Sequence, residues 1–558
     1  MDVYAPQKWL PHEKPVLPGS PSSPHHPAGR RVAYLVVGLI VSVTGGLGNA
    51  MVSANLPYLQ GSLGVYSSEI QWLPAAYVMA NVSMNLLLVK FRQQFGLRLF
   101  TELFLMLYAA ATVAHLFVHG LGSAIAVRAA HGMSGAALST LGLYYVLQAF
   151  PAQHRLKAVV LGIGFPQLAL PMARLFSSEL LELGEWRGLY FFELGLALLS
   201  LGCVLALKLP PGDRIKAFEK LDFLTFGLFA PGVALLSAVL ALGRTVWWFE
   251  SVWLGYSLAG AIVLIAAALS IEHNRARPLL NTRWLSNANI ARLALSVLLI
   301  RVVQSEANGT VGFLQALGLN NDQMMQLWWV VMAGTLAGLL ASALLIAPAR
   351  LQQMLMFSLA VMAAGAYMDS DATNLTRPAD LYLSQFLLGF GGGFFIGPTF
   401  VSGFGAVIAA PNNLVSFSVM FSITQNLGSL LGSALVGTFQ VLREKYHSSL
   451  LVEHLTLLDP QVAARVQAGG ASIAGALADP AARNAQGVAA LGAVATREAN
   501  ILAYNDVFLL ITAVALATLA WMLARYLWTI CTACQPAVPA QNAQTGMAHV
   551  SLNNSGSR

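Results

Sequence analysis

The apolar region of the chain begins with Arg31–Val52, which reads RVAYLVVGLIVSVTGGLGNAMV. Only the first of these residues is charged. A helix that crosses a bilayer needs roughly 20 mostly apolar residues, because about 30 Å of hydrocarbon is covered at ~1.5 Å per residue. Backbone amides in lipid must be paired within their own segment, which a helix achieves. The stretch therefore predicts a membrane-spanning helix.

Similar stretches recur along the whole chain, separated by short polar breaks. The predicted spans cover residues 32–53, 71–91, 99–119, 123–147, 157–178, 189–208, 222–242, 252–271, 290–315, 324–347, 353–369, 381–409, 414–442 and 504–527. Hydrophobic residues make up 57% of the chain and charged residues 10%, against roughly 25% charged in soluble domains. The sequence predicts an all-α polytopic membrane protein.

The cations in the short loops predict the orientation of the spans. Alternate loops hold Lys90, Arg92, Arg98, Arg155, Lys157, Lys208, Arg214, Lys216, Lys220, Arg275, Arg277, Arg283 and Arg350. The loops between them hold only Arg187, Arg244 and Arg377, beside Glu69, Glu179, Glu182, Glu185, Asp322, Asp369 and Asp371. Cytoplasmic loops are enriched in Lys and Arg, so both termini are predicted to be cytoplasmic. The net charge of +7 is then a topology signal, and no nucleic-acid partner is expected.

Few residues remain outside the spans. Residues 1–31 are rich in Pro, Ser and His and lack a long apolar run, so they predict a disordered cytoplasmic tail without a signal peptide. Residues 529–558 indicate a second such tail. The lone CxxC of Cys531 and Cys534 favours free thiols over a metal site, because no second ligand pair is present.

One long segment, residues 444–503, is predicted to lie on the outer side between the last two spans. It is rich in Ala, and Pro480–Asn500 has the pattern of a helix. Two interpretations stay open: an amphipathic hairpin that caps the outer mouth, or a docking surface for an external partner.

The motifs of common enzymes are missing from the sequence. There is no P-loop, no paired His motif on a helix and no Gly-x-Ser-x-Gly elbow. We therefore predict neither catalysis, nor a cofactor, nor direct use of ATP. A transporter of this kind must use an ion gradient or run downhill.

Ionisable residues within spans are the main functional signal, because each costs several kcal/mol in lipid unless it faces a cavity or a partner. The candidates are Arg128, His131, Arg174, Glu193, Arg301 and Glu306. Structural roles remain open for several: Arg128 as an anchor on backbone carbonyls, His131 as a neutral core residue, and Arg174 and Glu193 as interfacial groups. Glu306 is the best candidate for a proton carrier, because a carboxyl in a low dielectric can load and release protons near neutral pH.

Polar and small residues complete the predicted pathway. Polar and aromatic candidates to line it are Trp72, Tyr77, Asn81, Gln425 and Asn426. Candidates for bending or close helix packing are Gly391, Gly393, Gly397, Pro398, Gly428 and Gly432.

The order of several short motifs resembles the major facilitator superfamily, and within it the fourteen-span drug:proton antiporter branch of EmrB-like multidrug efflux permeases. The resemblance is carried by Asn55-Leu56-Pro57, Ile70-Gln71-Trp72, Arg128–Gly132, Glu185-Trp186-Arg187, Gly243-Arg244, Phe386–Pro398 and Asn500–Phe508. It implies two six-helix bundles, residues 32–208 and 272–528, with two additional central spans in residues 209–271. It also implies proton antiport by alternating access, and a tripartite assembly with a periplasmic adaptor and an outer-membrane channel.

Three positions depart from the pattern of that branch. The acidic position of the first span falls on Gly48, the loop after the second span carries Gln93 and Gln94 in place of charges, and the Gly-Pro motif of the fifth span falls near Arg174. These departures put the usual proton route in doubt. With no acid in the first span, the buried arginines favour an anionic or weakly acidic substrate.

The sequence thus predicts a secondary transporter of the bacterial inner membrane that exports small amphipathic, drug-like compounds. Two other functions remain open, an uptake permease for organic anions and a non-transporting sensor or scaffold.

Overall fold

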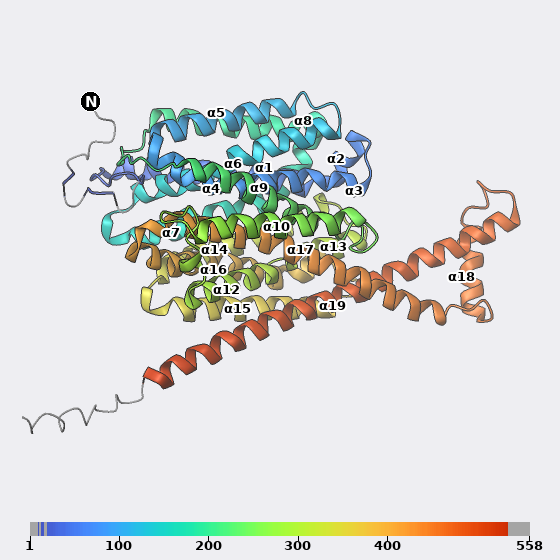
Figure 1. Cartoon of the computed structure of the whole chain (residues 1–558). Coiled ribbons are helices and arrows are strands. Elements are labelled where there is room, and N and C mark those ends of the chain that lie inside the picture. Colours follow the sequence, from blue (N-terminus) through green and yellow to red (C-terminus); the bar gives the residue numbers. More distant parts are fainter. Residues whose placement is uncertain (1–8, 11–12, 16–18, 534–558) are drawn as a thin grey trace, which may run out of the picture.

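The structure is a computed structural model that describes residues 9–10, 13–15 and 19–533, without the side chains of residues 177–178, 182–185, 308 and 532–533. Every regular element in these ranges is a helix (Figure 1). The predicted all-α class is therefore confirmed. Of the second predicted tail, residues 529–533 belong to the last helix. Residues 534–558, which include Cys534, lie outside the described residues.

The helices follow the predicted spans closely. The longer ones are α1 (Ala28–Ala54), α4 (Trp72–Phe95), α5 (Leu97–His115), α6 (Leu121–Ala149), α7 (Arg155–Gly164), α8 (Ala169–Ala206), α9 (Lys220–Leu242), α10 (Val252–His273), α12 (Ala288–Val303), α13 (Glu306–Ala316), α14 (Met325–Leu345), α15 (Leu351–Met368), α16 (Tyr382–Ala409), α17 (Leu414–Glu453), α18 (Pro460–Ala471) and α19 (Pro480–Ala533). Short helices α2 (Leu56–Leu63), α3 (Ser67–Ile70) and α11 (Thr282–Leu285) connect them, with 3-10 turns η1 to η7.

Twelve segments of the described chain are long and apolar enough to cross a membrane. Helix α6 and the α12–α13 pair lie at the two remaining predicted spans. The chain is a multi-pass membrane protein, and the count of fourteen spans stays a prediction.

Helix α8 contains a reversal of the chain. One candidate membrane span, Ala152–Phe176, ends within this helix. The next candidate span, Trp186–Ala206, lies entirely within it. A Cβ atom on Gly188 would lie 2.0 Å from the carbonyl oxygen of Leu180. Eight residues of a straight helix would separate these positions by about 12 Å, so the chain must double back between the two predicted spans.

Glycines bring helices of each half into close contact. In the N-terminal half, a Cβ atom on Gly132 of α6 would lie 2.3 Å from the Tyr77 carbonyl oxygen on α4. In the C-terminal half, a Cβ atom on Gly338 of α14 would lie 2.0 Å from the carbonyl oxygen of Phe390 on α16, and Gly393 packs on Thr335 in the same way. Small residues let helix backbones approach closely in lipid.

Helices α9 and α10 lie beside the two halves. Helix α9 contacts α4 of the first half, α17 of the second half and α10. Ser83 on α4 donates a hydrogen bond to the Ala230 carbonyl on α9 at 3.2 Å. The predicted division into two bundles and two extra spans remains a proposal, and these contacts agree with it.

An apolar seal joins the two halves at one end of the bundle. Buried side chains of α4 and α7, including Val89 and Val160, share one core with Val407 of α16 and Val415 of α17. Val160 lies against Gly397, where a Cβ atom would be 2.6 Å away. We call this end the basic end, because α4 and α10 finish there near Lys90 and Arg275.

The described part of the N-terminal segment packs at the same end. Ser22 accepts a hydrogen bond from Gln148 at 2.9 Å through its carbonyl, and its amide donates to the Pro211 carbonyl at 3.0 Å. The His26 ring lies 3.1 Å from the Gln148 amide oxygen. A tail predicted to be disordered gives no hint of these contacts.

A helical extension formed by the end of α17, α18 and the start of α19 projects from the opposite end of the bundle (Figure 1). Arg443 and His447 on α17 both contact the Asp506 carboxylate on α19 at 2.6 Å. Helix α18 packs on α19 where Gly487 meets the Val466 carbonyl. The predicted insertion therefore forms a helical arm, and α18 lies away from the bundle (Figure 1).

Replacing Gly338 with Ala tests the glycine contact between α14 and α16. The added methyl would collide with the Phe390 backbone, so we expect a loss of about 1–3 kcal/mol of stability, the usual cost of overpacking. Thermal unfolding of the purified protein in detergent measures it. Gly405→Ala on α16 is the control, because no atom lies within 4 Å of its added methyl. Equal unfolding temperatures for the two variants would contradict the contact.

Candidate functional site

A cavity of about 940 Å³ lies between the two halves. Its walls come from α1, α4, η2 (Phe165–Leu168), α8, α9, α12, α13, α14, α15, α16, α17 and α19. The lining positions run from the middle of the helices, as at Gly392 and Asn426, to the end opposite the basic end, as at Ser67 and Thr245. Because the apolar seal closes the basic end, the cavity faces the end that carries the arm.

The cavity wall combines apolar side chains with amides and carries an excess of positive charge. Its amide side chains belong to Asn49, Gln71, Gln167, Gln304, Gln315, Gln385, Asn426 and Gln440. Its charged residues are Arg244, Arg301 and Glu306. A wall of amides with two guanidinium groups can hydrogen-bond an anionic solute and hold it in place.

Arg301 has polar partners without a counter-charge. Its guanidinium donates to the Gln304 side-chain oxygen at 2.5 Å and to the Gln425 carbonyl at 3.2 Å. Arg244 lies against Gly437, whose Cβ position is 2.4 Å from the arginine Cδ. Among the described residues, no carboxylate forms an ion pair with either arginine. A carboxylate or sulfonate of a solute could supply the missing charge.

A helix break brings Arg301 and Glu306 to the same cavity. Helix α12 ends at Val303 and α13 begins at Glu306, with Gln304 and Ser305 between them. On a continuous helix these two side chains would point about 140° apart. At the break both line the cavity. The Glu306 carboxylate accepts hydrogen bonds from Thr310 and, at 3.3 Å, from Gln385.

Arg128 is fully buried inside the N-terminal half. It donates to the Gly48 carbonyl at 2.7 Å, to the Asn49 side-chain oxygen at 3.0 Å and to the Leu73 carbonyl at 3.4 Å, and its guanidinium lies 4.7 Å from the Tyr77 ring centre. It joins α6 to α1 and α4, as a structural anchor would. Through Asn49 it also orients a side chain that lines the cavity.

His131 lies in a second buried cluster of that half. Its Nε2 atom is 3.1 Å from the Glu193 carboxylate, which also accepts a hydrogen bond from Tyr108 at 2.6 Å. A Cβ atom on Gly48 would lie 2.7 Å from that carboxylate. The acid expected in the first span is thus absent from α1, and the Glu193 carboxylate of α8 lies in its place.

Arg174 connects the two halves at the arm end. Its guanidinium donates to the Asn321 side-chain oxygen at 3.0 Å and to the Ala54 carbonyl at 3.3 Å, and lies 5.5 Å from the Trp328 ring centre. Trp328 lines the cavity, and Arg174 lies behind it. Arg174 therefore forms a polar contact across the end of the cavity opposite the seal.

The other predicted pathway residues have varied positions. Trp72 stacks on Trp253 with ring centres 6.0 Å apart, and Asn81 donates to the Gly132 carbonyl at 3.3 Å. Gln425 contributes its carbonyl to Arg301. Among the described residues that line the cavity, the predicted ones are Arg301, Glu306 and Asn426. The pathway roles of all ten residues remain predictions.

The predicted hinge glycines are packing positions in this conformation. Gly391 packs on Met362, Gly393 on Thr335, Gly397 on Val160, Gly428 on Arg301 and Gly432 on Ser305. Pro398 lies inside α16 without ending it. A bending role remains a proposal for these residues.

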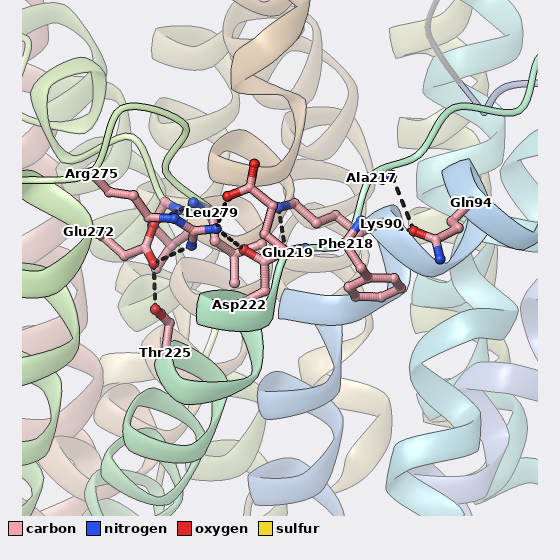
Figure 2. Close-up of polar contacts among 11 residues, drawn as sticks. Lys90, Gln94, Ala217, Phe218, Glu219, Asp222, Thr225, Glu272, Arg275 and Leu279 are labelled. Carbon is pink, nitrogen blue, oxygen red and sulfur yellow. Dashed lines mark hydrogen bonds and ion pairs between the residues drawn. The ribbon is translucent and has the colours of Figure 1, made fainter.

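A charge network at the basic end joins α4, α9 and α10 (Figure 2). Asp222, which is fully buried, contacts Lys90 at 2.6 Å and Arg275 at 2.8 Å. Arg275 also contacts Glu219 at 2.7 Å and Glu272 at 3.0 Å. Although burial alone would lower the pKa of Arg275, its hydrogen bonds to these three carboxylates raise that pKa above its usual value.

The network extends to both neighbouring segments. Glu272 accepts hydrogen bonds from Thr225 and from the Leu279 amide, which leads into the C-terminal half. Gln94, in the last turn of α4 at a position where the family resemblance expects charge, accepts hydrogen bonds from the amides of Ala217 and Phe218 at 3.2 and 2.9 Å (Figure 2). Helices α9 and α10 therefore connect α4 to the segment that leads into the C-terminal half at the basic end.

Removal of Asp222 tests this network. Asp222→Ala leaves Lys90 and Arg275 partly buried without their shared partner, and we expect about 3 kcal/mol of destabilisation. Glu219→Ala is the control, because its half-exposed carboxylate binds the same Arg275 and such pairs contribute about 0–1 kcal/mol. Thermal unfolding in detergent compares them, and equal losses would argue against a buried network.

Comparison with known proteins supports the interpretation of the fold. The model of the family described as "Major Facilitator Superfamily" matches residues 38–433, which are more than half of the chain. The structure is similar to that of the human organic anion transporter MFSD10 (TETRAN), with a TM-score of 0.52 at 12% identity, over 88% of this chain and 100% of that one. It is also similar to the proton:xylose symporter XylE, with a TM-score of 0.50 at 13% identity, over 88% of this chain and 95% of that one. At such identities these likenesses show the fold alone.

Two curated relatives are similar in sequence. The Efflux pump mlcE of Penicillium citrinum is 24% identical over 37% of this chain and 40% of its own length. The Probable actinorhodin transporter of Streptomyces coelicolor is 26% identical over 47% of this chain and 45% of its own length. The chain thus spans less than half the length of these relatives. From the family match and the two-halved helical fold around a central cavity, we conclude that the chain belongs to the Major Facilitator Superfamily.

Proposed function

We propose that this protein is a secondary transporter that exports small amphipathic, anionic or weakly acidic compounds by alternating access. The observation that carries the proposal is the pair of arginines, Arg244 and Arg301, on the wall of a cavity whose other charged group is Glu306. Arg301 is partly buried on α12 and has no counter-charge, which is costly in lipid, whereas Arg244 is exposed just beyond α9. An anionic solute that binds beside Arg301 stabilises its positive charge, whereas a cationic solute would be repelled.

The direction of transport is proposed from the relatives. One is named an efflux pump and the other a probable transporter of actinorhodin. In this conformation the cavity faces the arm end, and the predicted orientation makes that the outer side. The proposed cycle alternates this state with one in which the apolar seal opens and the cavity closes toward the arm end, where the Arg174 contact already joins the two halves. We place the protein in the bacterial inner membrane with both termini in the cytoplasm.

Proton antiport is the proposed source of energy. The described chain and its sequence contain no nucleotide-binding motif, and Glu306 supplies a carboxyl on the cavity wall. The resemblance to EmrB-like multidrug efflux permeases extends the proposal further. The transporter would then work in a tripartite system with a periplasmic adaptor and an outer-membrane channel. The arm of α17, α18 and α19 offers a surface of suitable position for a periplasmic adaptor that leads to an outer-membrane channel.

Replacing Arg301 with Ala tests the substrate class. We expect export of a fluorescein-type anionic dye to slow about tenfold or more, because a hydrogen bond to a charged group contributes about 1.5–3 kcal/mol. Efflux from loaded cells and flux in vesicles of known orientation measure the rate and direction. The matched control is Arg292→Ala on the same helix, whose partly exposed side chain binds Asn289 and does not line the cavity. Unchanged anion export in the Arg301 variant, or inward flux of the dye, would overturn this assignment.

Shortening the arm tests the proposed adaptor contact. Replacing residues 454–479 with a short Gly-Ser turn removes α18 and keeps the Arg443 and His447 contacts with Asp506. We expect the adaptor encoded beside the transporter to be lost on co-purification, with membrane insertion unchanged. An equal adaptor yield from this variant and the full chain would show that the arm has another role.

A further inference from the structure

Two carboxyl groups lie buried together beside the cavity. Glu306 is the first residue of α13, and Asp369 is the first residue of the 3-10 turn η5 (Asp369–Asp371), which follows α15. Each is only 1% exposed. Glu306 lines the cavity, whereas Asp369 lies behind that wall. From the sequence, Asp369 is expected to be an acid of an outer loop. The fold brings its carboxyl group close to that of Glu306.

One amide group bridges the two carboxylates. The Gln385 Nε2 atom on α16 donates to the Asp369 carboxylate at 2.7 Å and reaches the Glu306 carboxylate at 3.3 Å. The same nitrogen is 3.0 Å from the Thr310 hydroxyl, which donates to Glu306. The other oxygen of each carboxyl, Oε2 of Glu306 and Oδ1 of Asp369, has no hydrogen-bond partner among the described residues. Both oxygens therefore remain available to carry a proton.

The surroundings supply no cation to the pair. Helices α13, α16 and α19 and the turn η5 pack around it. The other ionisable groups on these elements and on the neighbouring α12 have other partners, are exposed or lie farther along α19. Arg301 binds Gln304 and Gln425, Arg292 binds Asn289, Tyr382 binds Gln326, Tyr504 packs on Gly312, and Asp506 binds Arg443 and His447. Glu498 binds Asn374 and lies 3.6 Å from the exposed Arg497, Asp371 and Cys531 are exposed, and Arg483 lies beside Gly470 of α18. Arg525 and Tyr526 lie about 30 Å along α19 from Tyr504. Among the described residues, no Lys, Arg or His forms an ion pair with Glu306 or Asp369.

We propose that Glu306 and Asp369 form a single proton-binding site in which one proton is shared between two carboxyl groups. Two carboxylates this close in a water-poor setting, without a cation, cannot both stay ionised. One proton removes the repulsion and leaves one negative charge. The hydrogen bonds from Gln385 and Thr310 and the positive N-terminal end of α13 stabilise that remaining charge. The pair therefore titrates as a unit.

The position of the pair defines how protons would exchange. Because Glu306 lines the cavity, water in the cavity can deliver a proton to its carboxylate oxygen, while Gln385 holds Asp369 as the charged partner. The same proton returns to water when the cavity faces the other side. This role deepens the proton antiport proposed above and rests on it for its place in transport. The binding of the proton itself does not depend on which solute is carried.

Infrared spectroscopy of the purified full-length protein in lipid nanodiscs tests the proposal with the proton as the probe. Difference spectra across neutral pH report the carbonyl band of a protonated carboxyl. We expect wild type to show this band at neutral pH, and both Glu306→Gln and Asp369→Asn to lose it, because the single remaining carboxylate no longer faces a second charge and is held ionised by the hydrogen bonds from Gln385 and, at Glu306, Thr310. Asp371→Asn, two residues away and exposed, is the matched control and should keep the band.

Three outcomes would overturn the proposal. If the band survives in Asp369→Asn, Glu306 holds its proton alone and the pair is not the site. If it survives in Glu306→Gln, the proton lies elsewhere. If sodium in place of choline removes the wild-type band at constant pH, the pair binds sodium. Elution of each variant as a single folded species on size exclusion verifies that the loss is local. A band that follows the expected pattern in a protein that exports no anion would sink only the proposed transport function.

Discussion

The cost of placing a charge in lipid governs this structure. A charged side chain at mid-bilayer costs several kcal/mol unless polar partners surround it. Most buried charges of the described chain meet this demand within the protein: Arg128 through backbone carbonyls, Lys90 through Asp222, and Glu193 through His131 and Tyr108. Arg301 differs from these groups in its place, because its guanidinium binds neutral partners on the wall of a cavity that a solute can enter. In the proposed function, this is the charge that an anionic solute neutralises.

The two ends of the bundle are held by different kinds of contact, and this difference bears on the cycle. Apolar side chains such as Val160 and Val407 seal the basic end, and each large apolar group kept from water contributes about 1.5–3 kcal/mol. The opposite end has the hydrogen bonds of Arg174 to Asn321 and Ala54. Opening the seal exposes apolar surface to water, whereas opening the Arg174 contact exposes groups that water can satisfy.

Sequence alone was sufficient for the helices and for part of the site. Hydropathy located the spans because lipid imposes a length and a composition on every helix. Arg301 and Glu306 were found because charge within a span is rare. Arg244 and Asp369 were missed, since both lie near span ends, where a charge has a ready explanation as a loop residue. Nor could hydropathy reveal the break at Gln304 and Ser305, which has no Gly or Pro to mark it.

The partners of buried charges were the second limit of sequence analysis. In the sequence, Arg128 and His131 cannot be distinguished from Arg301, because each is an ionisable residue within a predicted span. Arg128 is satisfied by carbonyls of Gly48 and Leu73 on other helices, and His131 by Glu193 of α8. The composition of the sequence does not show which backbone carbonyls accept hydrogen bonds. Its periodicity does not show a partner that lies more than sixty residues away. Only packing separates an anchoring charge from one that faces a cavity.

The charge of the proposed cargo also bears on the energy available for export. Moving a monovalent anion outward while one proton moves inward transfers two positive charges toward the negative side of the membrane. Each charge gains about 2.3 kcal/mol per 100 mV, so the potential contributes about 4.6 kcal/mol per 100 mV in each cycle. The same proton exchanged for a monovalent cation would gain nothing from the potential. In the proposed cycle, one proton exchanged for each anion therefore draws on the potential twice, without a second acid in the first span, where Gly48 lies.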